Sequence, residues 1–190
     1  DFGLGAGLRY KLTQAISMGD EEREKQLVST AYISMSAIML LLLLIGIPLI
    51  VNLNWPNILN CDFVEATELI LCVVMVLAVF VVQFVLELIS IVLQADQRAA
   101  ISSVFKPLAN LLSLVAILVM IPFYHNSLVI ACLALTIPVV VVLFIANIYQ
   151  FHNRYKRIAP SFRDFRRDCI KAIYSLGVKY FARQFSVFVV

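Results

Sequence analysis

Two long stretches of this chain contain no basic residue, and this one-sided placement of charge constrains the fold more than any other feature. No Lys or Arg occurs from Gln26 to Gln97, and no Asp, Glu, Lys or Arg occurs from Pro107 to Asn153. Each stretch is about twice the ~20 apolar residues that a membrane-spanning helix needs, so each predicts a pair of spans. The basic residues beside these pairs mark one membrane face as cytoplasmic.

Composition supports a membrane protein. Hydrophobic residues make up 62% of the chain and charged residues only 14%, which would leave a soluble domain covered in apolar surface. The net charge of +3 is spread over several loops, so no nucleic-acid partner is expected. The cysteines lack metal-ligand spacing, and we interpret Cys72 and Cys132 as small hydrophobic residues within spans. The predicted fold class is all-α, a polytopic transmembrane helical bundle.

The first segment predicts a helix that ends near residue 16 and a second helix that begins after Asp20. Gly3, Gly5 and Gly7 are typical of a face on which helices pack closely. Asp20 suits the N-cap of the second helix, and Glu21 and Lys25 have the spacing of an i,i+4 ion pair. Complete spans are predicted at about 27–53, 66–94, 101–123 and 128–150, with cytoplasmic loops at 9–26, 95–100 and 152–176.

The basic segment 152–176 predicts an amphipathic helix on the inner membrane surface. Its apolar stripe consists of Phe162, Phe165, Cys169, Ile173 and Leu176. Gly177 is expected to open a further span that is cut off at Val190. The chain starts with Asp1 inside a helix, which indicates a piece of a longer protein. The predicted domains are therefore helices of one lobe at 1–151, a linker at 152–176 and the start of the next helix at 177–190.

Charges inside spans are the strongest candidates for function, because an ionisable group at membrane depth is costly. Glu87 and Lys106 are each about 9–12 Å from the inner ends of neighbouring spans, at a rise of ~1.5 Å per residue. Gln83 and Asn110 extend each charge by one helical turn. Three interpretations remain open: the charges reach the interface or pair to hold the hairpin, they line a hydrophilic cavity, or they relay a proton or ion.

A second set of polar residues lies near the inner face. Lys179 and Arg183 are one turn apart and suit either an anionic ligand such as pyrophosphate or a positive collar at the interface. Asn147 and Gln150 are interpreted mainly as packing residues, with a lumen contact as the alternative. His125 and His152 are predicted at opposite membrane faces, and paired carboxylates within a span are absent from the sequence. Neither an enzyme nor a bound metal is therefore expected.

Several motifs together resemble a known family. The run Asp1-Phe2-Gly3-Leu4-Gly5-Ala6-Gly7-Leu8-Arg9, with Lys11-Leu12-Thr13 and Gly19-Asp20, resembles the junction of the second and third helices of Wzx-like polysaccharide flippases. These belong to the MATE-related multidrug/oligosaccharidyl-lipid/polysaccharide (MOP) superfamily. Gln97 to Val119 is similar to an inner turn and its helix, and Arg157 to Ser161 through Leu176-Gly177, Phe181 and Gln184 resemble the linker into the seventh helix.

The resemblance implies a two-lobe transporter of which this chain covers the end of helix 2 to the start of helix 7. It implies a cavity that carries undecaprenyl-pyrophosphate-linked oligosaccharide across the bacterial inner membrane, for O-antigen or capsule synthesis. A polysaccharide polymerase complex is an implied partner. No cofactor is implied, but Na⁺ or H⁺ is a candidate coupling ion.

The resemblance also assigns residues. The helix-2 motif is carried by Asp1, Gly3, Leu4 and Arg9, and Gln184 holds a polar position early in helix 7, whereas Arg183 departs from the apolar residue expected there. The predicted cavity residues are Arg9, Gln83, Glu87, Lys106, Asn110, Arg183 and Gln184. The alternatives are a MATE-type drug or cation antiporter, which needs a deep acidic residue, and a membrane-embedded polymerase or glycosyltransferase, which usually has a large catalytic outer loop. A third alternative is a helical membrane scaffold that has no substrate.

Overall fold

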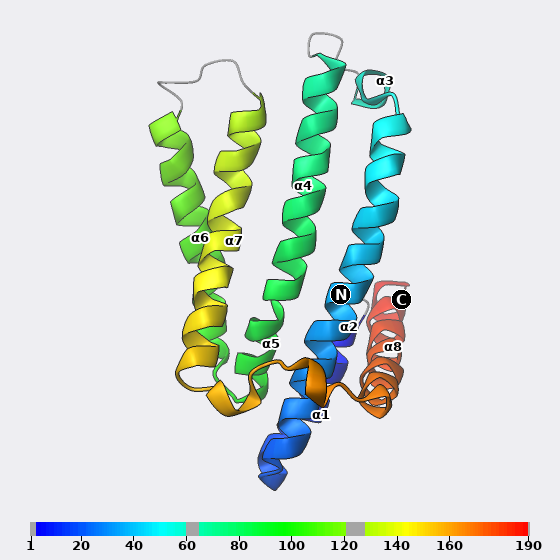
Figure 1. The fold of residues 1–190 in the computed structure, drawn as a ribbon, viewed down its shortest axis with the longest axis vertical. Coiled ribbons are helices and arrows are strands. Elements are labelled where there is room, and N and C mark those ends of the chain that lie inside the picture. The colour runs from blue at the N-terminus through cyan, green and yellow to red at the C-terminus, as the bar shows by residue number, and fades with distance from the viewer. Residues whose placement is uncertain (1–2, 60–64, 121–127, 190) are drawn as a thin grey trace. The chain divides into compact units, whose positions relative to one another are not determined.

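The computed structural model describes the backbone of residues 3–59, 65–120 and 128–189, and every regular element in these ranges is a helix. Cys61, Asp62 and the turn Tyr124–Ser127 of the predicted outer loops lie outside the described residues, as does Asp1 of the helix-2 motif. In chain order the helices are α1 (Leu4–Met18), α2 (Glu21–Asn52), α3 (Trp55–Leu59), α4 (Ala66–Leu86), α5 (Leu88–Ala95), α6 (Ala99–Met120), α7 (Leu128–His152) and α8 (Arg167–Val189) (Figure 1). Two 3₁₀ turns, Lys156–Ile158 and Phe162–Asp164, lie between α7 and α8.

The predicted spans are confirmed as helices. Among the described residues, four helices are long and apolar enough to cross a membrane: Glu21–Asn52, Ala66–Ala95, Ala99–Met120 and Leu128–His152. Each is longer than the ~20 residues that cover the hydrocarbon core. Their leucines include side chains exposed along one helix face, such as Leu40, Leu41 and Leu44 of α2. Such a face is unfavourable in water and suits lipid.

The chain divides into two compact units. The first unit contains Asp1–Ser36, Glu87–Ser103 and Ala146–Val190, and the second contains Ala37–Leu86 and Val104–Ile145. In the first unit α1 packs against α5 and α8. The core there is formed by fully buried side chains of several helices, among them Leu8, Leu12, Leu27, Leu88, Ile89, Leu93 and Ile173. In the second unit small residues such as Ala109 and Ala134 are buried, which allows close helix packing.

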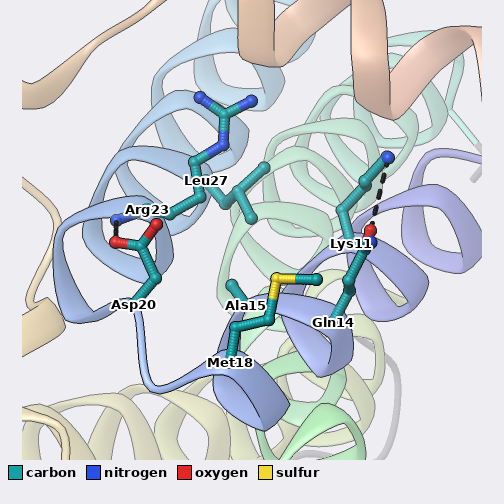
Figure 2. A pocket seen from close by; sticks show the side chains of 7 residues that line it. All are labelled: Lys11, Gln14, Ala15, Met18, Asp20, Arg23 and Leu27. Atoms are coloured by element: carbon teal, nitrogen blue, oxygen red, sulfur yellow. Dashed lines mark hydrogen bonds between the residues drawn. The ribbon is translucent and has the colours of Figure 1, made fainter.

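The turn between α1 and α2 forms as the sequence predicts. Gly19 ends α1 with a φ of 69°, a left-handed conformation that glycine adopts without steric cost. The Asp20 carboxylate accepts a hydrogen bond of 2.9 Å from the backbone N–H of Arg23, which caps α2. Figure 2 shows this turn beside a small pocket whose lining includes Met18 and Leu27. The Asp20 N-cap is confirmed.

The linker differs from the prediction. The helix expected across 162–176 begins only at Arg167 and then continues without interruption through Gly177 to Val189. Pro160 cannot donate a backbone hydrogen bond, and Ser161 caps a separate 3₁₀ turn by accepting from the N–H of Arg163. Phe162, expected in the apolar stripe, is 88% exposed. The prediction that one helix covers 162–176 and that a separate helix opens at Gly177 is therefore wrong.

The stripe residues within α8 pack against protein. Cys169 and Ile173 are 0% and 1% exposed, and α8 lies along α1 within the first unit. The Ile173 carbonyl contacts Gly7 of α1, and Gly177 contacts Gly3. The predicted small-residue packing face of Gly3 and Gly7 is confirmed. It packs against the face of α8 that was predicted to contact lipid.

Candidate functional site

Helix α6 carries the polar residues that the sequence placed on one side of a cavity. In the second unit Lys106 and Asn110 are both exposed, and four positions of helix put them about 40° apart on one face. The neighbouring stripe of the helix consists of small, buried residues: Ala109 is 2% exposed and Ser113 is 6% exposed. The Ser113 hydroxyl donates to the Leu135 carbonyl of α7 at 3.0 Å, which fixes that stripe against α7.

The opposite side of α6 is apolar. Leu108 and Leu112 are both 42% exposed, and the helical step of ~100° per residue places them roughly opposite to Lys106 and Asn110. A helix that exposes leucines on one side suits lipid there. The exposed amide and ammonium on the other side are costly in hydrocarbon and require water or a polar partner.

Helix α4 ends next to the second predicted polar pair. Gln83 is half-buried near the end of α4, and Glu87 occupies the interruption between α4 and α5, where neither Pro nor Gly lies. The Glu87 carbonyl accepts from the N–H of Ser90 at 2.9 Å, which starts the next helical turn. Sequence reasoning missed this interruption. It places a break in the helix at the ionisable residue of the span, a feature often found at functional sites. The juxtaposition of Glu87 with Lys106 stays a prediction.

Arg9 of α1 contacts the end of α5, about two helical turns beyond Glu87. Its guanidinium donates to the side-chain oxygen of Gln94 at 3.3 Å, and Thr13 of the same helix donates to the Ala95 carbonyl at 3.2 Å. Gln94 follows Glu87 by seven residues, about 10 Å along the helix axis. Arg9 therefore lines a groove between α1 and α5 of about 460 Å³, rather than meeting Glu87.

The remaining predicted residues have separate outcomes. Arg183 and Gln184 lie in α8, but their side chains are outside the described residues. Asn147 is 8% exposed, and its side-chain oxygen accepts from the Tyr32 hydroxyl at 2.8 Å. Gln150 is 9% exposed. The interpretation of Asn147 as a packing residue is confirmed.

A cluster around Asp96 was not predicted. The Asp96 carboxylate accepts from the Tyr155 hydroxyl at 2.7 Å and from the Arg154 Nε at 3.2 Å, and it lies 3.3 Å from the Arg98 Nε. Burial and the hydrogen bond to Asp96 raise the pKa of Tyr155 to about 12. Nearly 60 positions separate Asp96 from Arg154 and Tyr155, so no local spacing could have indicated the cluster.

Two further ion pairs bind the linker to the start of α2. Arg157 donates to Glu21 at 2.7 Å, and Lys25 lies 2.9 Å from Asp164. The predicted i,i+4 pair of Glu21 with Lys25 is wrong, because each side chain takes a partner from the linker instead. Exposed pairs of this kind are worth little individually, but together they hold the linker in one position.

Buried hydroxyls of α2 complete this attachment. Ser29 and Thr30 are both 0% exposed and accept hydrogen bonds from the backbone N–H groups of Ser161 and Arg166, at 3.0 and 3.1 Å. These bonds satisfy linker amides that no helix could pair. Within residues 3–59, 65–120 and 128–189, no group of three His, Cys, Asp or Glu side chains gathers to hold a metal ion.

The fold is similar to that of two solved transporters. One is a multidrug resistance MATE family transporter of the MOP superfamily in an inward-facing conformation, with a TM-score of 0.76 and 19% identity over 93% of this chain. The chain has the fold of a MATE transporter. A second structure, a MATE in complex with MaL6, has a TM-score of 0.71 and 21% identity over 99% of this chain.

The MATE fold extends beyond this chain in both structures. The chain covers 40% of the first MATE structure and 42% of the second. No protein-family profile and no curated protein sequence matches it. The predicted fold class, an all-α transmembrane bundle of MATE-like architecture, is confirmed.

Proposed function

We propose that this chain is part of a transporter that moves a lipid-linked oligosaccharide, with an undecaprenyl-pyrophosphate anchor, across the bacterial inner membrane. The observation that carries the proposal is the exposed polar face of α6, with Lys106 and Asn110, on a helix whose other side is exposed leucine. In a membrane such a face requires water, a polar partner within the protein or a polar ligand, and we propose an aqueous cavity. The MATE fold supports a transporter with such a cavity.

The charge on this face favours an anionic substrate. In the described part of the second unit the charged residues are Lys106, Glu65 and Glu68. Glu68 lies in the first turn of α4, where its carboxylate accepts from the N–H of Leu128 at 2.9 Å, so it caps α7. The Lys106 ammonium would attract a pyrophosphate, and the Asn110 amide can replace water around sugar hydroxyls. Such a transporter needs no covalent step.

A MATE-type antiporter of drugs or cations is the second candidate function. The observation that favours it is Glu87 at the interruption between α4 and α5. A carboxylate at a helix break within a span is suited to bind and release H⁺ or Na⁺. The same acid could couple an ion gradient to oligosaccharide export, so its substitution alone does not separate the two functions.

Accessibility from water tests the cavity. In a cysteine-free form of the full-length protein, Lys106→Cys and Asn110→Cys should react with a membrane-impermeant thiol reagent. Leu108→Cys is the matched control, because Leu108 is 42% exposed but lies on the apolar side. We expect reaction at 106 and 110 and protection at 108. If 106 and 110 are as protected as 108, the cavity is wrong.

Transport assays separate the two functions. Proteoliposomes of the full-length protein should translocate a lipid-linked oligosaccharide, and Lys106→Gln should lower that rate by about tenfold, the equivalent of ~1.4 kcal/mol. Efflux of a cationic dye, abolished by Glu87→Gln and unaffected by Lys106→Gln, would support the antiporter instead. A polysaccharide polymerase that co-purifies with the protein would support a role in O-antigen or capsule synthesis.

A further inference from the structure

Two cysteines from distant parts of the sequence meet inside the second unit. Cys72 of α4 and Cys132 of α7 are both free thiols, and their side chains lie close enough to interact. Cys72 is only 4% exposed. No local pattern could have paired them, because about 60 residues lie between the two positions. Their interpretation as separate small hydrophobic residues therefore missed the contact.

A second, independent contact sets the register of the two helices. One turn before each cysteine, the Glu68 carboxylate of α4 accepts from the backbone N–H of Leu128 of α7 at 2.9 Å. Cys72 and Cys132 each follow these residues by four positions, one turn in both helices. The two helices thus run alongside each other in register from their first turns. The faces that carry residues 72 and 132 therefore lie against each other.

The pair lies near one end of both spans. Cys72 is six residues from the start of α4 and Cys132 four residues from the start of α7, about 9 and 6 Å along the helix axes. The predicted orientation places these helix starts at the outer face of the membrane. Disulfides form and persist in the compartments beyond that face. Both thiols also lie within apolar spans, and a lipid-soluble oxidant can reach the half-buried Cys132 there.

We propose that Cys72 and Cys132 form a redox-active dithiol site that is oxidised to a disulfide by a lipid-soluble quinone. Each thiol loses one proton and one electron, and a bond forms between the two sulfurs. The quinone accepts both electrons and both protons and becomes the hydroquinone. The new bond joins α4 covalently to α7 and closes a loop of about 60 residues, which restricts separation of these two helices.

A third thiol, that of Cys169, provides the contrast. Cys169 is fully buried in the first unit, in the face of α8 that packs on α1, and belongs to a different unit from the Cys72–Cys132 pair. It should remain a free thiol under conditions that oxidise Cys72 and Cys132. Oxidation by this route therefore depends on the pairing of two thiols, and burial alone does not produce it.

The experiment uses membranes that contain the unsubstituted full-length protein. They are treated with a short-chain benzoquinone, quenched with acid, denatured and alkylated with a maleimide, and the cysteine peptides are identified by mass spectrometry. We expect Cys72 and Cys132 to lose reactivity together, to appear as one cross-linked peptide pair lighter by two hydrogens, and to regain reactivity after a dithiol reductant. Cys169 should be alkylated throughout.

Single substitutions test the pairing. In Cys72→Ser the thiol of Cys132 should stay fully alkylatable after quinone, and in Cys132→Ser so should that of Cys72. The proposal is overturned if both thiols of the unsubstituted protein remain reactive after quinone treatment. It is equally overturned if each gains oxygen on its own, because that product needs no partner thiol.

Discussion

Gly3 and Gly177 meet backbone to backbone where α1 crosses α8. A Cβ placed on Gly177 would lie 2.7 Å from the Gly3 carbonyl oxygen, and a Cβ on Gly3 would strike the Gly177 carbonyl. One turn further along α1, Gly7 makes the same kind of contact with the Ile173 carbonyl. The two helices therefore approach more closely than any side chain permits, and the first unit depends on glycine at these positions.

Replacing Gly177 with alanine should destabilise the first unit. The added methyl group meets backbone atoms of α1 that cannot rotate away, so the helices must separate at an expected cost of about 1–3 kcal/mol. The thermal unfolding midpoint of the purified full-length protein in detergent measures this. Gly46→Ala is the matched control, because its new Cβ would meet only the flexible side chain of Leu77, whose nearest methyl lies at 2.7 Å. Equal midpoints for the two variants would contradict the close crossing.

The same contact shows how far the sequence could predict the fold. Gly3, Gly5 and Gly7 indicated a packing face, since small residues at short spacing serve few other purposes in a membrane helix. They did not indicate the partner, because Gly177 lies at the far end of the chain. Hydropathy predicted the spans well, since length and apolarity determine them. The start of α2 was predicted from Asp20, whose capping bond is local.

Predictions failed where a local pattern competed with a distant partner. The spacing of Phe162 with Cys169 indicated one helix, but Ser161 and the α2 hydroxyls hold the chain in turns up to Arg166. The spacing of Glu21 and Lys25 indicated a local ion pair, but both found partners on the linker. Long-range hydrogen bonds leave no periodicity in the sequence, so patterning could not have found them.

For the candidate site, the sequence was informative on residue type and helix face. Lys106 and Asn110 share an exposed face of α6, as their spacing required. The groove that holds Arg9 and the cluster around Asp96 depend on which helices pack together, and composition carries no signal of that. The role of Glu87 and Lys106 in transport stays a prediction.

The buried hydroxyls of α2 should control the local stability of the linker. Removing the acceptors with Ser29→Ala and Thr30→Val leaves the N–H groups of Ser161 and Arg166 without partners, at a cost of about 1 kcal/mol each. Hydrogen exchange at these two amides should accelerate by about fivefold in the full-length protein. Ser17→Ala is the control, because its exposed hydroxyl bonds only within α1. Unchanged exchange at 161 and 166 would show that other contacts hold the linker.

The N-cap of α2 should depend on the side-chain oxygen of residue 20 rather than on its negative charge. Asp20→Ala removes the acceptor for the Arg23 N–H and should destabilise the protein by about 1 kcal/mol, whereas Asp20→Asn keeps a side-chain oxygen and should lose much less. Thermal unfolding of the full-length protein compares the two. An equal loss in the two variants would mean that the negative charge of Asp20 matters and the capping hydrogen bond does not.

Tyr155 should ionise only in strong alkali, and its bond to Asp96 should fail there. Burial and the carboxylate of Asp96 raise its pKa to about 12, from a usual value of about 10. Because the folded pKa is the higher one, the stabilisation is fully present below about pH 10 and is lost as the pH rises through about 12. The difference in phenolate absorbance between the native protein and Tyr155→Phe should therefore titrate near pH 12.

In Asp96→Asn the pKa of Tyr155 should fall, since the carboxylate no longer disfavours the phenolate, but burial should keep it above 10. A midpoint near pH 10 in the native protein would mean that the hydroxyl of Tyr155 does not bond to Asp96 in the membrane.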